Sequence, residues 1–469
     1  MIRADAFHLP ALDLDRVTGW DVRRFGDEVE LRTPLLDASL LEGVLERLRA
    51  ARARALADRP VAELVDIIDR AAGRLADERD PLRRQAEGAL PAITGYSPPM
   101  VRLIVERMAR DWRADALHAL LAAELGDARV LDGLRPDPAA AGRHRRAYGP
   151  ELAFHVFAGN VPGVAVTSLV RSLLVKAATL GKTASGEPLL AALFARALAE
   201  VDQRLGECLA VTYWPGGTEA LERLALESAD LVVVYGGEET VAALRGRMPA
   251  GKRLVVHGPR LSFGVIGRES LGREQARHVA ARAARAVAVF DQQGCVSPHV
   301  LYVERGGGLQ PDDFAALLAE ELARLEEDLP RGRLSPAEAA AIQHARSAAE
   351  FRGMAGRTVR LFASSGTEYT VLYDDDPALT PSCLNRVVWV KPLEDLFDLA
   401  DLVRPFAGRL QTAAAATTPE RLARLAEALG RVGISRITDL ERMPWPPVTW
   451  HHDGQEPLRE LIRWVDLEV

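Results

Sequence analysis

Residues 152–184 read LAFHVFAGNVPGVAVTSLVRSLLVKAATLGKTA, and this stretch decides the fold class. Its apolar beginning, residues 152–159, predicts a buried strand, and the NVPG sequence that follows is typical of a turn. Residues 164–179 predict a helix, and a second, short strand is expected over 180–184. The stretch therefore predicts one strand–helix–strand unit of a parallel α/β sheet.

The same alternation continues as far as residue 258. Further strands are predicted over 207–214, 229–237 and 252–258, with helices over 188–205 and 221–228. The sequence ADLVVVYGG, at 229–237, is almost continuously apolar, as expected for a parallel strand that is covered on both faces. This order of elements predicts the α/β class.

The regions on either side of this alternation differ from it. Residues 36–126 predict mainly helices, and the polar stretch 135–149 predicts a connection. On the C-terminal side we expect a helix over 272–289, mixed helices and strands over 310–410, and a last helix from Thr418-Pro419 to Gly433.

The composition is that of an ordinary globular protein of 469 residues, 48% hydrophobic and 27% charged. The net charge of −7 argues against nucleic acid or an anionic membrane as the main partner. No apolar run approaches the ~18 residues that a membrane helix needs, and the N-terminus lacks the apolar core of a signal peptide. We therefore expect a cytoplasmic protein without stable membrane insertion.

The three cysteines are few, widely spaced and odd in number, which argues against a disulfide framework and fits a reducing cytoplasm. Neither a CxxC pair nor an HExxH motif occurs, so no metal site is predicted. Cys208 lies among apolar neighbours, as structural cysteines do, and Cys383 could be structural or reactive. Cys295 follows a polar turn and a glycine that lets backbone and ligand approach closely, which makes it the candidate nucleophile.

Polar residues follow two of the predicted strands, where ligands of open α/β sheets collect. Asn160 could be a turn asparagine or an amide donor to an oxyanion. Lys182 could be an ordinary surface lysine or, with the hydroxyls of Thr183 and Ser185 beside it, could bind ribose or phosphate.

Glycines follow two further strands, as the pairs Gly216-Gly217 and Gly236-Gly237. A dinucleotide could approach the backbone closely at such positions. The GxGxxG fingerprint is absent, which excludes only the commonest dinucleotide motif.

The order of these segments resembles the aldehyde dehydrogenase superfamily and, within it, the LuxC-type acyl-CoA reductases of bacterial luminescence. The resemblance covers roughly residue 152 to the C-terminus. Four segments are similar to superfamily motifs: FAGNVPG to the Asn-Phe-Pro segment, LGKTAS to the lysine strand, DLVVVYGGEETV to the Gly-Ser-x-Glu turn and DQQGCVSPHVLYVE to the nucleophile segment. The ending, PPVTWHHDG and then PLRELIRWVDLE, resembles the LuxC type specifically.

The resemblance implies a role for each candidate residue. Cys295 would be the nucleophile and Asn160 the oxyanion donor, while Lys182 would hold the adenosine ribose and Gly236-Gly237 would lie under the cofactor pyrophosphate. The implied fold has a Rossmann-type cofactor domain and an α/β catalytic domain. Its parts would be a mainly helical region of the cofactor-binding lobe at 1–150, a Rossmann-like NADP-binding domain at 151–290, a catalytic domain at 291–415, and a C-terminal segment at 416–469 that returns to the site and the oligomer interface.

Two departures from the superfamily pattern bear on the reaction. Hydrolytic members carry a glutamate general base in a Leu-Glu-Leu-Gly-Gly segment, where this chain has LVVHGP, residues 254–259, without a carboxylate. Water would be poorly activated, so an acyl-enzyme thioester would survive until it is reduced. NAD-preferring members often place a glutamate three residues after the lysine. Here that residue is Ser185, which leaves Lys182 free to pair with a 2′-phosphate and favours NADPH.

The expected activity is NADPH-dependent reduction of a fatty acyl-CoA or acyl-protein thioester to the aldehyde through an acyl-cysteine. His257 could orient groups or donate a proton to the departing thiolate, or it could be a strand-end histidine in a polar network. His451 and His452 could line the mouth of the site.

Three alternatives stay open. They are oxidation of an aldehyde to the acid with NAD(P), a cysteine acyltransferase without hydride chemistry, and a non-catalytic oligomeric scaffold. The family resemblance also implies a homodimer or homotetramer, and an acyl-protein synthetase as a partner.

Overall fold

The computed structural model describes residues 1–10, 12 and 14–468. The chain divides into two compact units. The first unit comprises Met1–Thr94, Val101–Gly258 and Pro447–Val469, and the second comprises Gly95–Met100 and Pro259–Pro446. Within the described part of the chain, no helix is long and apolar enough to cross a membrane.

The centre of the first unit is a five-stranded parallel sheet with the strand order β10-β9-β6-β7-β8. The strands are β6 (Leu152–Val156), β7 (Ala178–Lys182), β8 (Leu209–Thr212), β9 (Leu231–Tyr235) and β10 (Arg253–His257). Every residue of β6 and β9 is buried, as their continuous apolar sequences predict for strands covered on both faces. The predicted parallel α/β sheet is confirmed.

Two predicted helices are shorter than their sequence pattern indicates. The helix expected over 164–179 is α6 (Val164–Leu174), because Lys176 takes a left-handed conformation with φ 63° and starts the turn into β7. The helix expected over 188–205 is two helices, α7 (Leu190–Val201) and α8 (Gln203–Gly206). Asp202 separates them, since its carboxylate accepts from the Leu205 N–H at 2.8 Å and caps the second helix.

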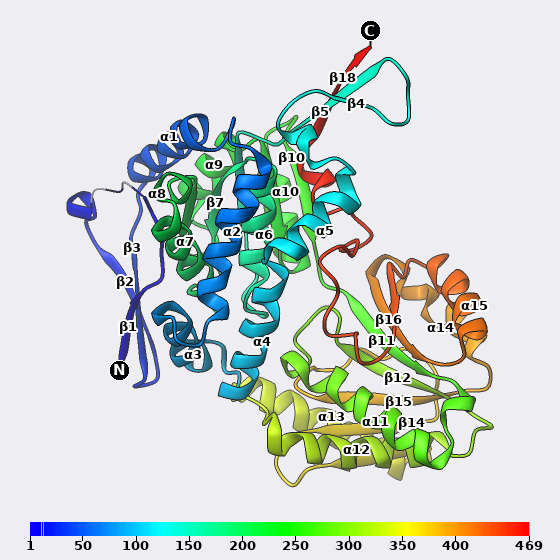
Figure 1. The fold of residues 1–469 in the computed structure, drawn as a ribbon. Helices are drawn as coiled ribbons and strands as arrows, with labels where there is room; N and C mark the ends of the chain where they lie inside the picture. The colour runs from blue at the N-terminus through cyan, green and yellow to red at the C-terminus, as the bar shows by residue number, and fades with distance from the viewer. Residues whose placement is uncertain (11, 13, 469) are drawn as a thin grey trace. The chain divides into compact units, whose positions relative to one another are not determined.

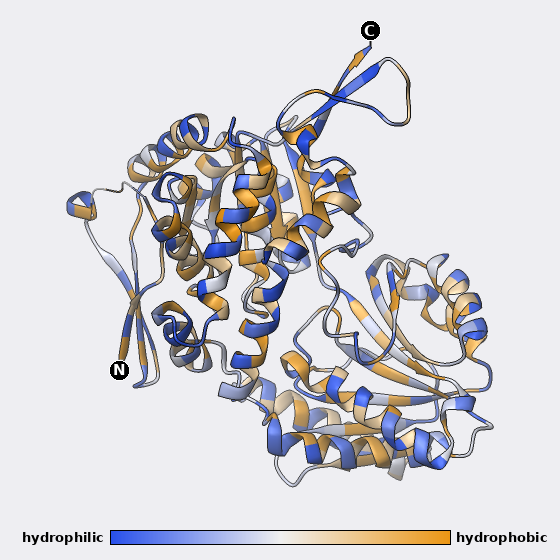
Figure 2. Cartoon of the chain, in the orientation of Figure 1, coloured by the Kyte–Doolittle hydropathy of each residue, from blue (hydrophilic) through white to orange (hydrophobic). Residues whose placement is uncertain are grey.

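Helices cover the sheet of the first unit and bury their apolar faces against it, as the colouring in Figure 2 shows. α2 (Val61–Ala76) packs on other helices, mainly α7, and its residues Leu64, Ile68 and Leu75 are fully buried, at the spacing of one helical face. The remaining helices of this region are α1 (Ala38–Ala55), α3 (Pro81–Thr94), α4 (Pro98–Asp111), α5 (Ala114–Leu125), α9 (Glu219–Ser228) and α10 (Glu238–Arg247).

Two small sheets complete the first unit. One is formed near the N-terminus by β1 (Ile2–Asp5), β2 (Trp20–Phe25) and β3 (Val29–Pro34), in the order β1-β3-β2. The other has the order β18-β5-β4 and consists of β4 (Arg135–Pro136), β5 (Arg143–Tyr148) and β18 (Arg463–Glu468). It projects from the rest of its unit as an arm (Figure 1). The prediction of a mere connection over 135–149 was wrong, because β5 pairs with a strand more than 300 residues later, from Arg143↔Glu468 to Tyr148↔Arg463.

The second unit is built on a seven-stranded sheet in the order β13-β14-β15-β12-β11-β16-β17, parallel except for β13. Its strands are β11 (Leu261–Ile266), β12 (Pro298–Glu304), β13 (Val359–Ala363), β14 (Thr370–Asp374), β15 (Val387–Leu393), β16 (Leu410–Ala416) and β17 (Arg436–Thr438). Its helices are α11 (Arg273–Ala288), α12 (Pro311–Asp328), α13 (Pro336–Met354), α14 (Leu399–Val403) and α15 (Pro419–Gly430).

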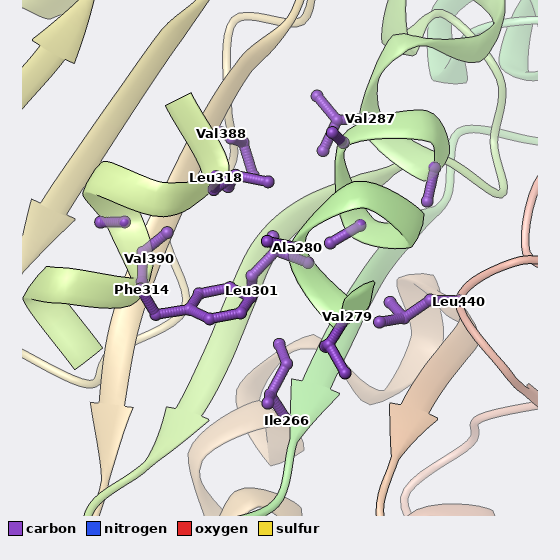
Figure 3. Packing of buried hydrophobic residues seen from close by; sticks show 14 of the residues in the cluster. Ile266, Val279, Ala280, Val287, Leu301, Phe314, Leu318, Val388, Val390 and Leu440 are labelled. Atoms are coloured by element: carbon purple, nitrogen blue, oxygen red, sulfur yellow. The ribbon is translucent and has the colours of Figure 1, made fainter. Parts of the chain in front are cut away.

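Both faces of this sheet are buried. Along β12, Leu301 and Val303 point into one apolar cluster, and Val300 and Tyr302 point into another. Figure 3 shows the first cluster, in which α11 and α12 pack their apolar faces on the strands. A sheet packed on both sides holds the ends of its strands rigidly, and the loop before β12 is attached to such an end.

Candidate active site

Cys295 lies in the second unit, in the turn that leads into β12, and is half-buried. Its backbone carbonyl accepts a hydrogen bond from the Ser262 hydroxyl at 2.7 Å, and that hydroxyl accepts from the Thr412 N–H at 3.2 Å. Ser262 belongs to β11 and Thr412 to β16. The peptide that carries the thiol is therefore held by two strands of the buried sheet.

The other two cysteines lie in less reactive surroundings. Cys208 is buried, and burial raises the pKa of its thiol to about 12. Burial also raises the pKa of the Cys383 thiol. Since the thiolate is the nucleophilic form, both residues are poorly suited to attack a carbonyl at neutral pH. Cys295 therefore stays the candidate nucleophile.

Two runs of left-handed backbone support the turn before Cys295. Phe290, Asp291 and Gln292 have φ values of 60°, 45° and 66°, and residues 384–386 have values of 67°, 56° and 63°. Each such non-glycine residue costs about 1–3 kcal/mol unless its surroundings enforce it. The two runs enforce each other, since the Asn385 N–H donates to the Asp291 carbonyl at 3.1 Å. The sequence contained no signal for either run.

Side chains of the same two left-handed runs make further hydrogen bonds that hold the turn, and we call the two runs with these bonds the left-handed frame. The Arg386 guanidinium donates from Nε to the Asp291 carboxylate at 2.9 Å, and both side chains are buried. The Gln292 amide donates to the carbonyls of Pro298 and Val387, at 2.7 and 2.9 Å. These bonds tie the turn to the start of β12 and of β15.

Gly294, the residue before the nucleophile, is required by close packing. A Cβ atom at this position would lie 3.1 Å from a ring carbon of Phe290 and 3.2 Å from the Ser297 hydroxyl. The Gly294 carbonyl also accepts from the Ser297 N–H at 2.9 Å, which closes the turn around Cys295.

A buried arginine provides positive charge near the nucleophile. Arg436, on β17, donates to the carbonyls of Met443 and Arg442 at 2.8 and 2.7 Å. Burial lowers its pKa to about 10, while the negative charges of Asp439 and of the Cys295 thiolate oppose that lowering. Arg436 thus lies near enough to Cys295 for their charges to interact. Nothing in the surrounding sequence, ISRITDLERM, distinguishes this arginine from a surface one.

In the first unit, the predicted polar residues lie where the parallel strands end. Asn160 is exposed and follows β6, the middle strand of the five. The strand order reverses at β6, and such a reversal is where α/β sheets bind ligands outside the carboxyl ends of their strands. Gly163, with φ 97°, then turns the chain into α6.

Lys182 is the last residue of β7, and its ammonium lies 5.7 Å from the centre of the Trp214 ring. Burial lowers the pKa of Lys182, and the negative charge of Glu222 opposes this. Thr183 is buried and donates from its hydroxyl to the Thr212 carbonyl at 3.2 Å, so its proton is already used inside the sheet. Ser185 is exposed.

The strand-end glycines line open space. A Cβ atom at Gly216, Gly217 or Gly237 would meet nothing within 4 Å, whereas at Gly236 it would lie 3.2 Å from Thr240. Gly217 has φ 84°, and its N–H donates to the Glu222 carboxylate at 3.0 Å. The three open positions offer bare backbone at the ends of β8 and β9.

His257 ends β10 and is part of a stack of four rings. Tyr235 and His257 are 4.5 Å apart between ring centres, His257 and His452 are 4.3 Å apart, and His452 and Trp450 are 4.7 Å apart. The Asp453 carboxylate, with a side chain only 1% exposed, lies 3.2 Å from His257 Nδ1 and 3.9 Å from His452 Nε2. The structure thus brings His257 and His452 together, while His451 is exposed.

Asp453 was not among the residues singled out from the sequence. It has φ 57° in a tight turn in which the Gly454 N–H donates to the His451 carbonyl at 3.0 Å. The sequence HHDG contains the available signal, because an aspartate before a glycine is typical of such a turn. That the turn meets His257, almost 200 residues earlier, is a tertiary contact.

The ligand atoms of His257, His452 and Asp453 lie within 4.8 Å of one another, a spacing that could hold a metal ion. The two imidazole planes are stacked and differ by only 21°. An imidazole nitrogen binds a metal along a lone pair that lies in the ring plane. Nearly parallel planes do not converge on one ion near both rings, so this arrangement favours a stacked pair held by a carboxylate. The adjoining cavity, lined by residues that include Ser168 and Arg171, measures ≈ 20 Å³, room for about one water molecule.

A known protein family matches most of this chain. The family model described as "Acyl-CoA reductase (LuxC)" matches residues 56–464. The chain belongs to the LuxC family of acyl-CoA reductases. This confirms the resemblance that was drawn from the motifs.

Curated proteins similar to this chain are long-chain acyl-protein thioester reductases. The chain is 23% identical to the long-chain acyl-protein thioester reductase of Vibrio harveyi, over 98% of this chain and 93% of that protein. It is 26% identical to the protein of the same name from Aliivibrio fischeri, over 87% of this chain and 82% of that protein.

Solved structures similar to this LuxC-family chain are aldehyde dehydrogenases. Aldehyde dehydrogenase 21 from Physcomitrella patens gives a TM-score of 0.76 at 13% identity, covering 100% of this chain and 98% of that one. Aldehyde dehydrogenase C from Pseudomonas syringae, solved as a mutant with NAD+ and octanal, gives 0.71 at 14% identity, covering 94% and 90%. The predicted aldehyde-dehydrogenase-like fold is confirmed, and a nicotinamide cofactor is consistent with this fold in a reductase family.

Proposed function

We propose that this chain reduces a long-chain acyl thioester, carried by CoA or by a protein, to the fatty aldehyde, with NADPH as reductant and Cys295 as nucleophile. The observation that carries the proposal is the turn around Cys295. It holds a half-buried cysteine with the buried Arg436 nearby, whereas burial raises the pKa of the Cys208 and Cys383 thiols. Membership of the LuxC family supports thioester reduction as the reaction class.

The first chemical step is acyl transfer to the protein. The Cys295 thiolate, favoured by Arg436, adds to the acyl carbonyl carbon, and an oxyanion forms. We assign Asn160 and the Cys295 backbone N–H as oxyanion donors, roles that the superfamily resemblance implies. The bond to the carrier sulfur then breaks, the carrier thiolate takes up a proton, and an acyl-cysteine thioester remains.

The second step is reduction of that thioester. NADPH supplies the hydride that reduces the thioester carbonyl carbon when the cofactor is bound. Collapse of the resulting hemithioacetal breaks the carbon–sulfur bond to Cys295, releases the aldehyde and restores the thiolate. We propose His257 as the group that delivers the proton to the departing carrier thiolate in the first step, with Asp453 orienting the imidazole through Nδ1.

The residue at the end of β10 favours reduction over hydrolysis. A carboxylate base at this place would activate water against the acyl-cysteine, and the chain has His257 instead. The ring is clamped between Tyr235 and His452, which restricts the approach of water to it. The acyl-enzyme would therefore persist until the reductant acts.

The cofactor proposal concerns the strand ends of the first unit. Lys182 and Ser185 would hold the 2′-phosphate of NADPH, and the open backbone at Gly216, Gly217 and Gly237 would accommodate the dinucleotide. The half-buried Lys182 fits an anionic ligand, because its ammonium is desolvated and gains from a negative partner. The five-stranded sheet of the first unit would belong to the NADP-binding domain, and the second unit, which carries Cys295, would be the catalytic domain. Their boundary along the chain lies at 258–259 and not at residue 290.

Replacement of Cys295 by alanine tests the proposal. We expect Cys295→Ala to abolish acyl-CoA-dependent NADPH oxidation, because no other residue can form the acyl-enzyme, while NADPH binding stays within about twofold. Mass spectrometry after incubation with acyl-CoA alone should find an acyl adduct on the Cys295 peptide of the wild type only. Cys383→Ala, a second half-buried thiol in the same unit, is the control and should keep both adduct and turnover.

The same assays separate the alternatives. Retained turnover in Cys295→Ala would overturn the proposed nucleophile. Release of CoA without oxidation of NADPH would indicate an acyltransferase, and acid formed from aldehyde and NAD(P)+ would indicate an oxidising dehydrogenase.

A further inference from the structure

The N-terminal strand β2 places an arginine at the turn that follows β7. Arg23 donates from Nη1 to the backbone carbonyl of Ser185 at 3.2 Å, across 162 positions of sequence. Its guanidinium also lies 4.0 Å from the centre of the Tyr213 ring, directly after β8. The two contacts fix a positive charge beside the residue to which the proposed function assigns the 2′-phosphate.

The Arg23 guanidinium has N–H donors for which the described residues provide no acceptor. The side chain is 19% exposed, and Nε and Nη2 are shielded from solvent without a hydrogen-bond partner. The Asp21 carboxylate lies 3.2 Å from Nε, so it balances charge without forming a hydrogen bond. A buried donor without an acceptor is unfavourable. The contact between Arg23 Nη1 and Ser185 is exposed, so an anion could reach the guanidinium there.

Arg23 and Lys182 each lie over an aromatic ring of the segment that follows β8. Lys182 lies over Trp214, and Arg23 lies over Tyr213, the preceding residue in the sequence. A guanidinium presents N–H groups in a planar fork that matches two oxygens of one phosphate, and an ammonium adds a point charge. The combination suits a dianionic phosphate better than a ribose hydroxyl.

We propose that Arg23 binds the 2′-phosphate of the dinucleotide together with Lys182 and Ser185, and that it sets the preference for NADPH over NADH. This inference rests on the proposed NADPH dependence and adds a residue that the resemblance did not suggest. It also gives the small N-terminal sheet a part in cofactor selection.

Calorimetric titration with 2′,5′-ADP and with 5′-AMP tests the proposal without any turnover. Arg23→Ala should weaken 2′,5′-ADP binding about 10- to 100-fold, the effect of one or two charge-assisted hydrogen bonds, and leave 5′-AMP within about twofold. Arg23→Lys keeps the charge and loses the planar set of N–H donors, so its affinity for 2′,5′-ADP should lie between those of the wild type and Arg23→Ala. Asp21→Asn removes the competing carboxylate and should tighten 2′,5′-ADP binding about two- to fivefold.

The matched control is Arg24→Ala. Arg24 is the next residue on β2, its side chain is 72% exposed, and it pairs with Glu30 at 3.0 Å. Both nucleotides should bind this variant as they bind the wild type.

The outcomes separate the two proposals. A wild type that binds 2′,5′-ADP and 5′-AMP equally overturns the NADPH preference itself. A wild type that prefers 2′,5′-ADP while Arg23→Ala matches Arg24→Ala overturns the role of Arg23 and leaves the NADPH proposal standing. The role of Arg23 is also overturned if Arg23→Ala and Arg23→Lys lose affinity for 2′,5′-ADP and 5′-AMP equally. Arg23 would then stabilise the fold and would not bind the phosphate.

Discussion

The environment of Lys182 supports the phosphate-binding role proposed for it, which its sequence position leaves open. An exposed lysine at the end of a strand is ordinary. Here the side chain packs on Trp214, and burial lowers the pKa of the ammonium. The charged form is therefore poorly stabilised in the unliganded protein and is stabilised again when an anion binds.

This gives a pH dependence for cofactor binding. The phosphate-binding form of Lys182 is the ammonium, which exists below its pKa. Because that pKa is lowered, the charge is lost at a lower pH than for an ordinary lysine, and NADPH affinity should fall as the pH rises through it. Below pH ~6 the affinity should fall as well, as the 2′-phosphate is protonated.

Fluorescence titration of NADPH between pH 6 and pH 10 checks this expectation. Lys182→Arg keeps its charge across the range, so its NADPH affinity should stay flat on the alkaline side. NADH, which lacks the 2′-phosphate, is the control ligand, and its affinity should depend little on pH. If NADPH affinity falls equally steeply with rising pH in the wild type and in Lys182→Arg, the assignment of Lys182 to the 2′-phosphate is contradicted.

At the scale of elements, the two left-handed runs at 290–292 and 384–386 determine how Cys295 is presented. Each run is unfavourable by itself, and each supplies hydrogen bonds that the other needs. The Asp291–Arg386 pair joins them with side chains that are 6% and 1% exposed, and Arg386 also pairs with Glu326 at 2.7 Å. Loss of one partner would leave a buried charge without compensation.

We therefore expect Arg386→Met to lower the free energy of unfolding of the second unit by about 3–5 kcal/mol, the usual cost of breaking a buried ion pair. Urea denaturation measures it. Arg404→Met is the control, because Arg404 and Asp401 form a pair with side chains 62% and 82% exposed, which contributes at most about 1 kcal/mol. Equal effects of the two substitutions would show that the left-handed frame does not depend on the buried pair.

The same substitution should also change the reactivity of Cys295. If the frame holds the thiol, iodoacetamide should alkylate Cys295 at a different rate in Arg386→Met and at the wild-type rate in Arg404→Met. If iodoacetamide alkylates Cys295 at the wild-type rate in both variants, the Asp291–Arg386 pair stabilises the unit without affecting the reactivity of Cys295.

At the scale of the whole molecule, the chain returns to its first unit through residues 447–469. This segment contributes Asp453 to the ring stack and then β18 to the projecting arm (Figure 1). In β18, Val465 and Leu467 are 39% and 42% exposed and lie two residues apart, on one face of the strand. An exposed apolar face on an edge sheet is typical of an interface between protein chains.

The expected homodimer or homotetramer can be tested at this face. Val465→Arg combined with Leu467→Arg should shift the protein toward a smaller species in size-exclusion chromatography with light scattering, because two charges would be buried without partners. Met354→Arg, at a residue 86% exposed on α13, is the control and should leave the mass unchanged. An oligomer that survives both arginines would place the interface elsewhere.

The sequence by itself determined the fold class, and it was enough to propose Cys295 as the nucleophile. Continuous apolar strands such as 229–237 are recognisable because both faces of a parallel strand are buried, and local composition records that burial. Cys295 was recognisable because a polar turn and a glycine surround it and because Asn160 and Lys182 stand in the order of a known family. Helix ends were misplaced where one residue, such as Lys176, left the helical conformation.

Only the tertiary structure decided which distant residues meet. Asp453 reaches His257, Arg23 reaches Ser185, and the stretch 135–149 finds its partner strand at 463–468. Periodicity reports which face of an element is buried, but not which remote segment covers it. Such contacts arise only when the chain has been brought together and the buried donors and acceptors must be satisfied. For that reason Cys295 could be proposed from the sequence, while the hydrogen bonds that hold its turn are visible only in the fold.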